Sequence, residues 1–393
     1  MKTMKWKFYS LAFVAGMSIL TACSSDDNND NDGNGGNGNG NEIENGTILK
    51  GTITSDVTLA AGNTYKLSGE YIVEEGATLH IEEGVKIIAV YDDIADYILV
   101  KQGGKINAVG TSDKPIVMTS EKEEPGAWGG IHICGRAHTN AEGGKGSSEI
   151  GGAVYGGNND ADNSGTLQYI RLEYTGFAFD EEHEANGISF YGVGNGTIVD
   201  HCQAYKGSDD GFEFFGGPVN VSNLVAVSCS DDSFDWTEGW NGKGTNLVAY
   251  QEAESTLGYD CDCLMECDNN GSNNAATPVA HPVLKNLILV GNGGSKQGIR
   301  LRAGTEVEID NAKVCGKGQP LTVETALTEN ALKNGTSKLT NITLTSELSC
   351  KEGIYTHADF IAVTSNKVDA NLSYSSFEDI KKECSWMNGS WVK

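Results

Sequence analysis

A short block of alternating apolar and polar residues recurs along the middle of the chain. Its pattern is Gly-apolar-X-apolar-X-Gly, where X is usually polar or charged. The copies, including degraded ones, lie at residues 130–135, 187–192, 211–216, 233–237, 264–268 and 298–302. Because side chains alternate across a β-strand, each copy predicts a short strand with one buried and one outward face. The step from Gly187 to Gly211 is 24 residues and the step from Gly211 to Ser233 is 22. A period of this length predicts a structural unit stacked on itself, as in a β-solenoid.

A second strand type accompanies each opening block and has the pattern X-Asn-apolar-X-apolar. Its asparagines are Asn223, Asn246, Asn286, Asn311 and Asn341. The step from Asn223 to Asn246 matches the period of the first block, whereas the step to Asn286 is widened by an inserted loop. An asparagine in the same turn of successive coils can hydrogen-bond to its neighbours in the stack. We therefore expect a structural asparagine ladder.

Two insertions interrupt the repeat. Residues 136–165 are rich in Gly, Asn and Asp, and residues 257–281 carry clustered cysteines together with Asp260, Asp262 and Asp268. Both are expected to loop out from the scaffold, and binding residues often lie on such loops. In the N-terminal part, residues 47–120 alternate apolar and polar residues between glycines, which predicts further short strands joined by coil turns.

The C-terminal part departs from the repeat. Residues 322–332 and 376–387 predict short helices, the second with Ser375 or Ser376 as its N-cap. We expect them to cap the last coil, since an open terminal strand invites edge pairing. The predicted organisation is a signal peptide (1–22), a tether (23–46), a parallel β-helix (47–320) and C-terminal coils with a helical cap (321–393).

Alternation also identifies which side chains face outward from the repeated strands. The first outward column is Ser189, Glu213, Asp235, Glu266 and Arg300, and the second is Tyr191, Phe215, Thr237, Asp268 and Arg302. The preceding turns add the pairs Asp209-Asp210 and Asp231-Asp232, and Asp262. Strands stack about 4.8 Å apart, and like charges about 4 Å apart repel by roughly 4 kcal/mol near a protein surface.

Three arrangements relieve this repulsion: carboxylates protonated because their pKa is raised, pairing with Arg300 and Arg302, or a bound hard cation. Calcium suits clustered carboxylates and is the cofactor we favour. The expected metal ligands are Asp209, Asp210, Asp231, Asp232, Asp235, Asp262, Glu266 and Asp268. In the alternative interpretation, the aspartates before Gly-Phe only cap turns by accepting backbone hydrogen bonds, and this weighs most for Asp209 and Asp231.

Aromatic residues beside the acids suggest a sugar-binding surface. Tyr191 and Phe215 are expected outward on adjacent coils, and Trp240 follows as a further exposed ring, whereas Trp236 is expected in the core. The expected ligand-binding residues are Tyr191, Phe215, Trp240, Glu213, Asp235, Glu266 and Arg300. Should the face be catalytic instead, the candidates are Asp210, Glu213, Asp232, Asp235 and Arg300. A calcium-dependent lyase also needs a basic residue, for which Lys206, Lys296 and Arg300 are candidates.

The N-terminus resembles that of an exported lipoprotein. Three lysines precede an apolar stretch that is too short to span a bilayer stably, and Leu-Thr-Ala-Cys at 20–23 is similar to a bacterial lipobox. This resemblance implies lipid attachment at Cys23. The alternative is an ordinary secretory signal. The Ser-, Asp-, Asn- and Gly-rich residues that follow predict a solvated tether, and their Ser/Asp start resembles a Bacteroidota surface-export signal; the alternative is a periplasmic spacer.

Composition narrows the class of partner and the role of the cysteines. A net charge of −26 argues against nucleic acid and is compatible with cation binding. Export permits disulfides, and Cys350 and Cys384 are a candidate pair. Cys202 is expected to be a packed thiol. Cys261, Cys263 and Cys267 are interpreted as a local disulfide or buried thiols rather than a zinc site, since no histidine is close in sequence.

Several segments together resemble a family of bacterial exported β-helix proteins, many of them Bacteroidota lipoproteins. These segments include Asp-Asp-Gly-Phe-Glu-Phe-Phe-Gly-Gly at 209–217, Asp-Asp-Ser-Phe-Asp at 231–235, and residues 84–87, 103–111, 114–120 and 128–130. The resemblance covers about residues 47–315 and implies an all-β fold, the right-handed parallel β-helix of pectate-lyase type. It implies no particular activity.

Three functions follow from these features. The first is an outer-membrane lipoprotein, exposed at the cell surface, that binds a glycan together with calcium; an outer-membrane transporter complex is a further candidate partner. The second is a polysaccharide lyase or glycoside hydrolase on the same scaffold, with Asp210 and Asp232, or Glu213 and Asp235, as acid and base. The third is a purely structural surface protein.

Overall fold

The computed structural model describes residues 41–92, 94–179 and 183–393. Cys23, the signal peptide and most of the expected tether lie outside the described residues. The strands are β1 (Asn41–Ile43), β2 (Ile48–Ile53), β3 (Val57–Leu59), β4 (Thr64–Val73), β5 (Thr78–Ile81), β6 (Lys86–Ala89), β7 (Tyr97–Val100), β8 (Lys105–Val109), β9 (Ile116–Ser120), β10 (Ile131–Cys134), β11 (Gly146–Ser147), β12 (Val154–Tyr155), β13 (Gly165–Glu173), β14 (Ile188–Tyr191), β15 (Ile198–Tyr205), β16 (Phe212–Phe215), β17 (Asn220–Val227), β18 (Phe234–Thr237), β19 (Lys243–Tyr250), β20 (Met265–Cys267), β21 (Val283–Val290), β22 (Gln297–Leu301), β23 (Glu308–Cys315), β24 (Gln319–Val323), β25 (Lys338–Leu344), β26 (Ser349–Cys350) and β27 (Lys367–Val368). The helical segments are α1 (Glu254–Leu257), α2 (Ala326–Asn334), α3 (His357–Ala362), α4 (Phe377–Glu383), η1 (Glu142–Gly144) and η2 (Ser385–Met387).

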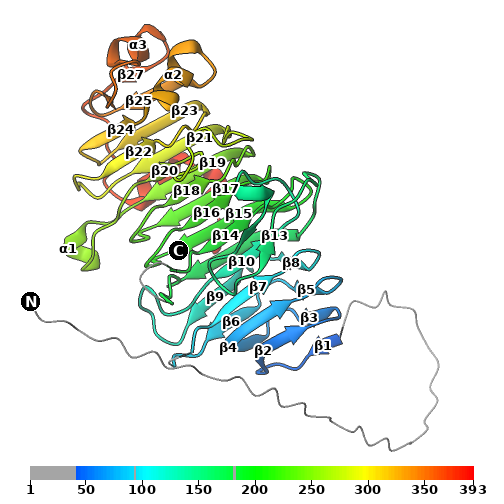
Figure 1. Ribbon diagram of the computed structural model, residues 1–393. Helices are drawn as coiled ribbons and strands as arrows, with labels where there is room; N and C mark the ends of the chain where they lie inside the picture. Colours follow the sequence, from blue (N-terminus) through cyan, green and yellow to red (C-terminus); the bar gives the residue numbers. More distant parts are fainter. Residues whose placement is uncertain (1–40, 93, 180–182) are drawn as a thin grey trace, which may run out of the picture. The chain divides into compact units, whose positions relative to one another are not determined.

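Apart from β11 and β12, which form a separate antiparallel pair, these strands form a right-handed parallel β-helix, which confirms the predicted fold (Figure 1). Each complete coil has three faces. The front face contains the short strands β7, β10, β14, β16, β18, β20, β22 and β24, each paired in parallel with the next. The longer strands β13, β15, β17, β19, β21 and β23 bend in the middle, so that their first and second halves form a middle face and a rear face.

The core is built from the apolar pair of each repeated block. Phe190 stacks on Phe214 with ring centroids 5.0 Å apart, and Phe212 stacks on Phe234 at 5.6 Å. All four rings are buried. Because the apolar pair fills the interior of the coil, the residue between its two members must point outward.

The asparagine ladder lies at the bend of the long strands and is confirmed for four of its five expected members, whereas the fifth, Asn341, donates to Asp310 instead. The side-chain amide of Asn246 donates to Asn223 at 2.8 Å, that of Asn286 to Asn246 at 3.0 Å, and that of Asn311 to Asn286 at 2.8 Å. These asparagines have φ between 55° and 63°. Asparagine tolerates this left-handed conformation better than most residues, which explains its use at a sharp bend.

The stack begins earlier in the sequence than we expected, and its other end lies within the expected C-terminal coils. Strand β1 begins at Asn41, inside the expected tether, and pairs with β3. At the other end β25 and β27 continue the rear face as far as Val368. Among the described residues, no helix is long and apolar enough to cross a membrane.

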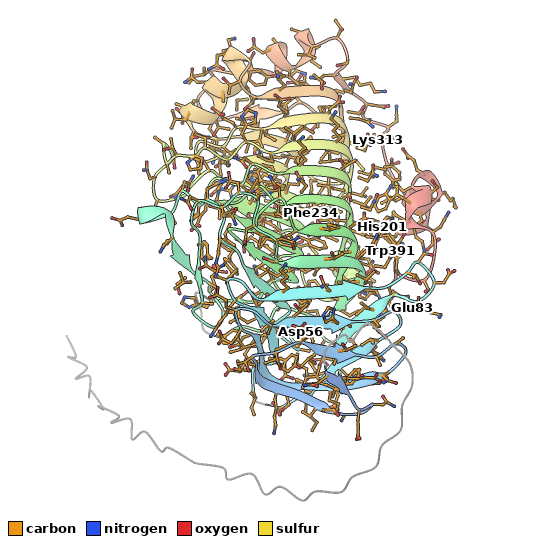
Figure 2. All side chains as sticks on the ribbon, turned by 90° about the vertical axis from the view of Figure 1, so that its right-hand side faces the viewer. Asp56, Glu83, His201, Phe234, Lys313 and Trp391 are labelled. Atoms are coloured by element: carbon orange, nitrogen blue, oxygen red, sulfur yellow. The ribbon has the colours of Figure 1, made fainter. Side chains whose placement is uncertain are left out.

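The two C-terminal helical regions have different roles. Helices α2 and α3 lie at the end of the stack, where Leu332 and Phe360 join the main core (Figure 1). Helix α4 was expected in the same cap, but it packs along the side of the stack instead. Its Ile380, together with Met387 and Trp391 downstream, contacts outward residues of the rear face. Figure 2 shows Trp391 beside His201, with Lys313 further along the stack.

The cysteines of the described chain are free thiols. Cys350 packs against the main core whereas Cys384 belongs to the apolar cluster under α4, so the expected disulfide between them is wrong. Cys261, Cys263 and Cys267 are buried thiols, in agreement with one of the two interpretations of that cluster. Cys202 is a packed core thiol, as expected.

Candidate functional site

The predicted outward column exists on the front face. The strand register places Ser189 beside Glu213, Glu213 beside Asp235, Asp235 beside Glu266, and Glu266 beside Arg300. The column therefore changes from acidic to basic along the stack. Because the strands are short and rigidly paired, these side chains are held at a fixed spacing.

The aspartate pairs lie in the turns that lead into β16 and β18. Asp210 accepts a hydrogen bond from the backbone N–H of Asp232 at 2.8 Å, and Asp232 accepts one from the N–H of Cys263 at 2.6 Å. The second aspartate of each pair thus uses one oxygen to join its turn to the next coil. This is the turn-capping role that the alternative interpretation assigned mainly to the first aspartates, Asp209 and Asp231. Both Asp210 and Asp232 are buried, whereas Asp209 is half-buried and Asp231 is exposed.

Turns and strands together line an acidic cavity of about 410 Å³ on the front face. Its lining residues are Glu149, Glu184, Asn186, Asp209, Asp210, Glu213, Asp231 and Asp235. Glu149 and Glu184 were not predicted from the sequence. Both lie outside the repeated strands, where no periodicity indicates the direction of a side chain. We call this site the acidic cavity.

The oxygens in the acidic cavity lie close enough to share one ion. One oxygen each from Asp210, Glu213 and Asp235 lies within 4.8 Å of the others, and the same holds for Asp209, Asp210 and Asp231. Calcium binds its oxygen ligands at 2.3–2.6 Å, so two ligands of one ion lie at most about 5 Å apart. Carboxyl groups of glycosidases stand about 5–5.5 Å apart in retaining and 6.5–9.5 Å apart in inverting enzymes. The cluster therefore fits chelation better than it fits an inverting hydrolase.

The acidic cavity has little internal charge compensation. The amide of Asn186 donates to Glu213 at 2.6 Å. Among the described residues, no lysine or arginine forms an ion pair with Asp209, Asp210, Glu213 or Asp235. The Oδ1 atom of Asp235 is buried and has no hydrogen-bond partner in the described part of the chain. A buried carboxylate oxygen without a partner is costly unless a proton or a cation neutralises the group.

The pKa values of the clustered acids reflect this environment. Burial, followed by repulsion from Asp231, raises the pKa of Asp209 to about 7. Burial and neighbouring carboxylates also raise the pKa of Asp210, Glu213, Asp232 and Asp235 well above the usual range. Without a cation the fold therefore holds protons in this cluster at pH values where an unfolded chain has lost them.

The basic end of the column is different, because its acids are paired. Arg300 binds Glu266 at 2.8 Å and Glu324 at 3.2 Å, and Arg302 binds Glu266 at 2.6 Å and Asp268 at 2.7 Å. Near these residues Asp262 is paired with Lys296. Asp262, Glu266 and Asp268, which we expected among the metal ligands, thus have cationic partners inside the protein. Arg300 is likewise engaged rather than directed at a ligand.

The basic residues considered for a lyase are also occupied. Lys206 pairs with Glu252 at 2.9 Å, and Lys296 and Arg300 are held as described above. The acidic cavity has no basic residue in its described lining. Of the five catalytic candidates, Asp210, Glu213 and Asp235 line the acidic cavity, and an oxygen of Asp232 lies within 4.8 Å of one of Asp235. Arg300 does not line it.

The expected aromatic sugar-binding surface is wrong. Tyr191 and Phe215 do point outward and stack at 4.4 Å, but the first insertion covers them, and Tyr155 contacts Tyr191 at 5.1 Å. Tyr191 is only 1% exposed. Trp240 is in the core, where it stacks on Phe214 at 4.2 Å and donates to the carbonyl of Val219. No ring of these three is free to stack on a sugar. Trp236 is buried, as expected.

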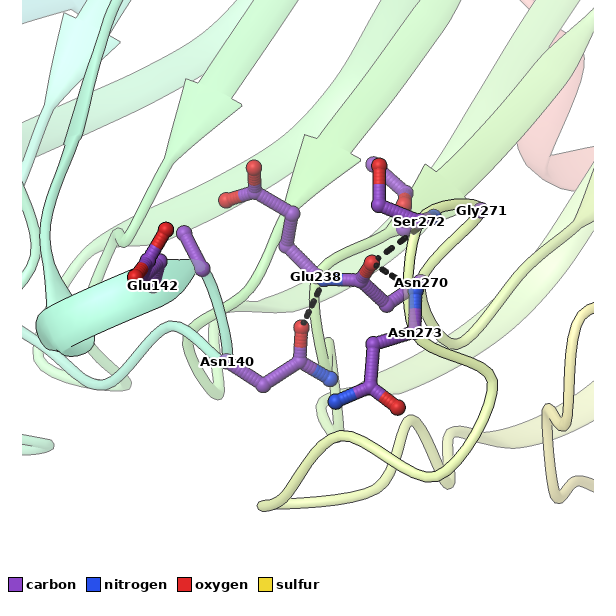
Figure 3. A pocket seen from close by; sticks show the side chains of 9 residues that line it. Asn140, Glu142, Glu238, Asn270, Gly271, Ser272 and Asn273 are labelled. Atoms are coloured by element: carbon purple, nitrogen blue, oxygen red, sulfur yellow. Dashed lines mark hydrogen bonds between the residues drawn. The ribbon is translucent and has the colours of Figure 1, made fainter.

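A second cavity, of about 700 Å³, lies next to the acidic cavity where the two insertions meet (Figure 3). Its lining residues are Asn140, Ala141, Glu142, Thr237, Glu238, Asn270, Gly271, Ser272 and Asn273. We call it the amide cavity. The sequence analysis identified both insertions as candidate binding loops, but it could not show that they meet, since residues so far apart in sequence are joined only by the coiling of the chain.

The fold and the site together define the class of this protein. It is a right-handed parallel β-helix whose front face is lined by carboxylates and carries two inserted loops. The chain belongs to the family described as the pectate-lyase like beta helix domain, whose model matches residues 51–393. No curated protein and no solved structure matches it. The family establishes the fold and is compatible with a glycan-related role.

Proposed function

We propose that this protein is a surface-anchored outer-membrane lipoprotein that binds a glycan through a calcium ion held in the acidic cavity. The observation that carries the proposal is the trio Asp210, Glu213 and Asp235. One oxygen of each lies within 4.8 Å of the others, and Asp235 offers a buried oxygen that has no partner among the described residues. A bound cation offsets the repulsion in this trio and presents an open coordination position to sugar hydroxyls or to a uronate.

The ligand set differs from the one expected from the sequence. It consists of Asp209, Asp210, Glu213, Asp231 and Asp235, which line the acidic cavity together with Glu149 and Glu184, and of Asp232, which has an oxygen within 4.8 Å of one of Asp235. The acids at the arginine end of the column are outside this set. Because Tyr191, Phe215 and Trp240 are covered, the glycan is recognised through the ion and polar groups rather than through ring stacking.

Calcium binding is tested by calorimetric titration of the β-helix from residue 42 onward. We expect calcium to bind and to raise the melting temperature, and Asp235→Asn to abolish both effects. The matched control is Glu254→Gln, which removes an exposed acid in α1 and should leave both effects unchanged. A melting temperature that is identical in calcium and in chelator excludes the calcium part of the proposal.

Glycan binding is tested on an array of polysaccharides and oligosaccharides with and without chelator. Binding that is weakened in chelator supports the ion as a point of contact. An array on which nothing binds, in either buffer, overturns the glycan part of the proposal.

An enzyme is the second candidate, favoured by the pKa of Asp209 near 7, which suits a general acid or base at neutral pH. Release of unsaturated or reducing sugar ends by the purified protein, abolished by Asp209→Asn or by Glu213→Gln, replaces the binding-only function with a lyase or hydrolase.

The anchor is proposed from the N-terminal sequence alone. Replacing Cys23 by serine should move the protein from the outer-membrane fraction to the soluble fraction of the producing cell. Protease added to intact cells should degrade the wild-type protein if it faces outward. Full protection from protease places it in the periplasm instead.

A further inference from the structure

The amide cavity is a preformed site rather than a gap between mobile loops. The side-chain amide of Asn140 donates to Oδ1 of Asn269 at 2.8 Å and to the carbonyl of Pro278 at 3.0 Å, and its oxygen accepts from Asn270 at 3.0 Å. Asn140 is buried. These bonds join the first insertion to the second, and the Asn140–Asn270 contact is visible in Figure 3. A site whose walls are fixed in advance binds with a smaller ordering cost.

A second anchor fixes the side of the amide cavity that faces the β-helix. Glu238, at the end of β18, accepts hydrogen bonds at Oε2 from Thr139 at 2.7 Å and from Tyr155 at 2.7 Å. Its φ of 53° is unusual for a residue other than glycine, and the surrounding contacts must hold it there.

Several polar groups of the lining remain available to a ligand. The hydroxyls of Thr237 and Ser272, the amide nitrogen of Asn273 and the Oε1 atom of Glu238 have no hydrogen-bond partner among the described residues. The volume of about 700 Å³ lies within the usual range of small-molecule sites, about 300–1,000 Å³. The lining offers both donors and acceptors and more polar than apolar surface, so it matches a ligand that combines hydroxyl groups with apolar carbon, such as a sugar.

The charge of the lining further narrows the chemical class of ligand that this cavity can bind. Glu142 and Glu238 are acidic, and the lining contains no lysine or arginine among the residues that the structure describes. An anionic sugar in this cavity meets repulsion with no compensating cation. An uncharged sugar meets only hydrogen-bonding groups.

The two cavities are lined by neighbouring outward residues of one strand, β18. Asp235 lines the acidic cavity and Thr237 lines the amide cavity. Both are outward residues of β18 separated by one inward residue, a distance of about 7 Å along the strand. A chain of sugars that contacts an ion at Asp235 has about 7 Å to cover before it reaches Thr237.

We propose that the amide cavity is a subsite for an uncharged sugar unit, adjacent to the unit that contacts the ion. The proposal rests on the proposed glycan-binding function and adds the chemical class of the neighbouring unit. Thr237, Ser272, Asn273 and Oε1 of Glu238 bind its hydroxyls, and the Asn140 bonds hold the walls in place.

The test is calorimetric binding of defined oligosaccharides to the purified protein in calcium and in chelator. The probes are neutral tetrasaccharides of glucose, mannose and galactose, with tetragalacturonate as the charged counterpart. We expect at least one neutral probe to bind more tightly than tetragalacturonate in chelator. Thr237→Val and Asn273→Ala should each weaken that binding about three- to tenfold, the usual effect of one lost hydrogen bond. Asn371→Ala, an exposed amide that does not line the cavity, should have no effect.

The outcomes separate the subsite from the function on which it rests. If the neutral probe binds, and its binding requires Thr237 and Asn273 but is unchanged by chelator, the subsite stands and the calcium proposal fails. If binding depends on calcium but neither variant changes it, the glycan function stands and the subsite is overturned. Preference for tetragalacturonate in chelator also overturns the subsite. If no probe binds in either buffer, both proposals are rejected.

Discussion

At the scale of single residues, Asp235 and Glu266 are neighbours in one column but have opposite electrostatic surroundings. Asp235 faces other carboxylates and has a buried oxygen without a described partner. Glu266 is bound by Arg300 and Arg302. Burial raises the pKa of both carboxyls, but removing the charge of Glu266 also leaves Arg300 and Arg302 with one partner fewer. The same kind of substitution at the two positions should therefore change stability in opposite directions.

Asp235→Asn is expected to stabilise the protein in chelator by about 1–2 kcal/mol, since a like-charge contact costs up to about 4 kcal/mol near a surface and protonation already relieves part of it. Glu266→Gln is expected to destabilise it by about 2 kcal/mol because two charge-assisted contacts are weakened. Thermal melts of both variants in chelator check the signs. Destabilisation by Asp235→Asn contradicts the view that this carboxylate is uncompensated.

The raised pKa of Asp209 leads to a prediction for the pH dependence of stability. Between pH 6.5 and 8.0 the unfolded carboxyls are fully ionised, whereas the folded protein still holds a proton on Asp209, whose pKa is about 7, and on its neighbours. The folded state binds more protons, so its stability in chelator must fall as pH rises. His132 acts in the opposite direction at the lower end of this window: burial lowers its folded pKa to about 4 whereas its unfolded pKa lies near 6.5, so the unfolded state holds about half a proton more at pH 6.5 and almost none more at pH 8.0.

Melting temperatures at several pH values in chelator and in calcium test this sign. We expect a fall with pH in chelator, by at most about 1.4 kcal/mol per pH unit for each proton, and a smaller slope in calcium, which displaces the protons. Asp209→Asn should reduce the slope in chelator. A melting temperature that rises from pH 6.5 to 8.0 in chelator refutes the assignment of protons to this cluster.

Alternation in the sequence was enough to place Glu213 and Asp235 outward but not to judge the exposure of their neighbours. Tyr191 and Phe215 point outward as predicted and are nevertheless buried, because the first insertion folds back over them. A period-two pattern reports which face a side chain joins, and it contains no information about what covers that face. Glu149 and Asn140 were missed for the same reason, since both lie on the insertion.

At the scale of elements, the bent strands explain why one residue type recurs at the corner of each coil. The asparagine at the bend satisfies two demands at once: a positive φ and a hydrogen bond to the coil on either side. The sequence predicted the ladder because a fixed spacing of one polar residue next to an apolar pair is visible without any structure. It did not show the sharp bend, which depends on φ.

Asn246 is at the centre of the ladder and offers the cleanest test. Asn246→Ala removes hydrogen bonds to Asn223 and Asn286 and places alanine at a φ of 60°. We expect a loss of about 2–3 kcal/mol, from two bonds of about 1 kcal/mol each and the strain of a left-handed alanine. Asn246→Gly keeps the conformation accessible and should lose only the part due to the bonds. Urea denaturation measures both. Equal losses in the two variants show that φ does not contribute.

At the scale of the whole molecule, the repeat predicted the coiling of the chain but not the segment that runs back along it. The C-terminal residues beyond α3 pass over the rear face and reach the early coils, where Ser390 donates to the carbonyl of Ser112 and Lys393 pairs with Glu173. A signal for this cover was present in the sequence. Residues 224–227 and 287–290 are apolar without interruption, a pattern typical of strands that are buried on both faces.

This C-terminal segment should stabilise the scaffold without taking part in ligand binding, because it covers the rear face and the two cavities open on the front and insertion side. Trp391 is fully buried and contacts Tyr169 and His201 at ring-centroid distances of 6.0 Å and 5.2 Å. Trp391→Ala should cost about 3–5 kcal/mol. Leu327→Ala, at an exposed apolar residue of α2, should change stability by less than about 0.5 kcal/mol.

Hydrogen exchange and calcium titration on the same variant separate the two roles. Trp391→Ala should increase exchange in the rear halves of β13, β15 and β17, which the segment covers, while the front strands β16 and β18 keep their protection and their affinity for calcium. The physical reason is that each coil contacts mainly its neighbours, so a defect on one face is not transmitted to a face held by its own ladder of backbone bonds. If calcium affinity falls together with rear-face protection, the faces are coupled and the acidic cavity depends on the whole stack rather than on its own coils.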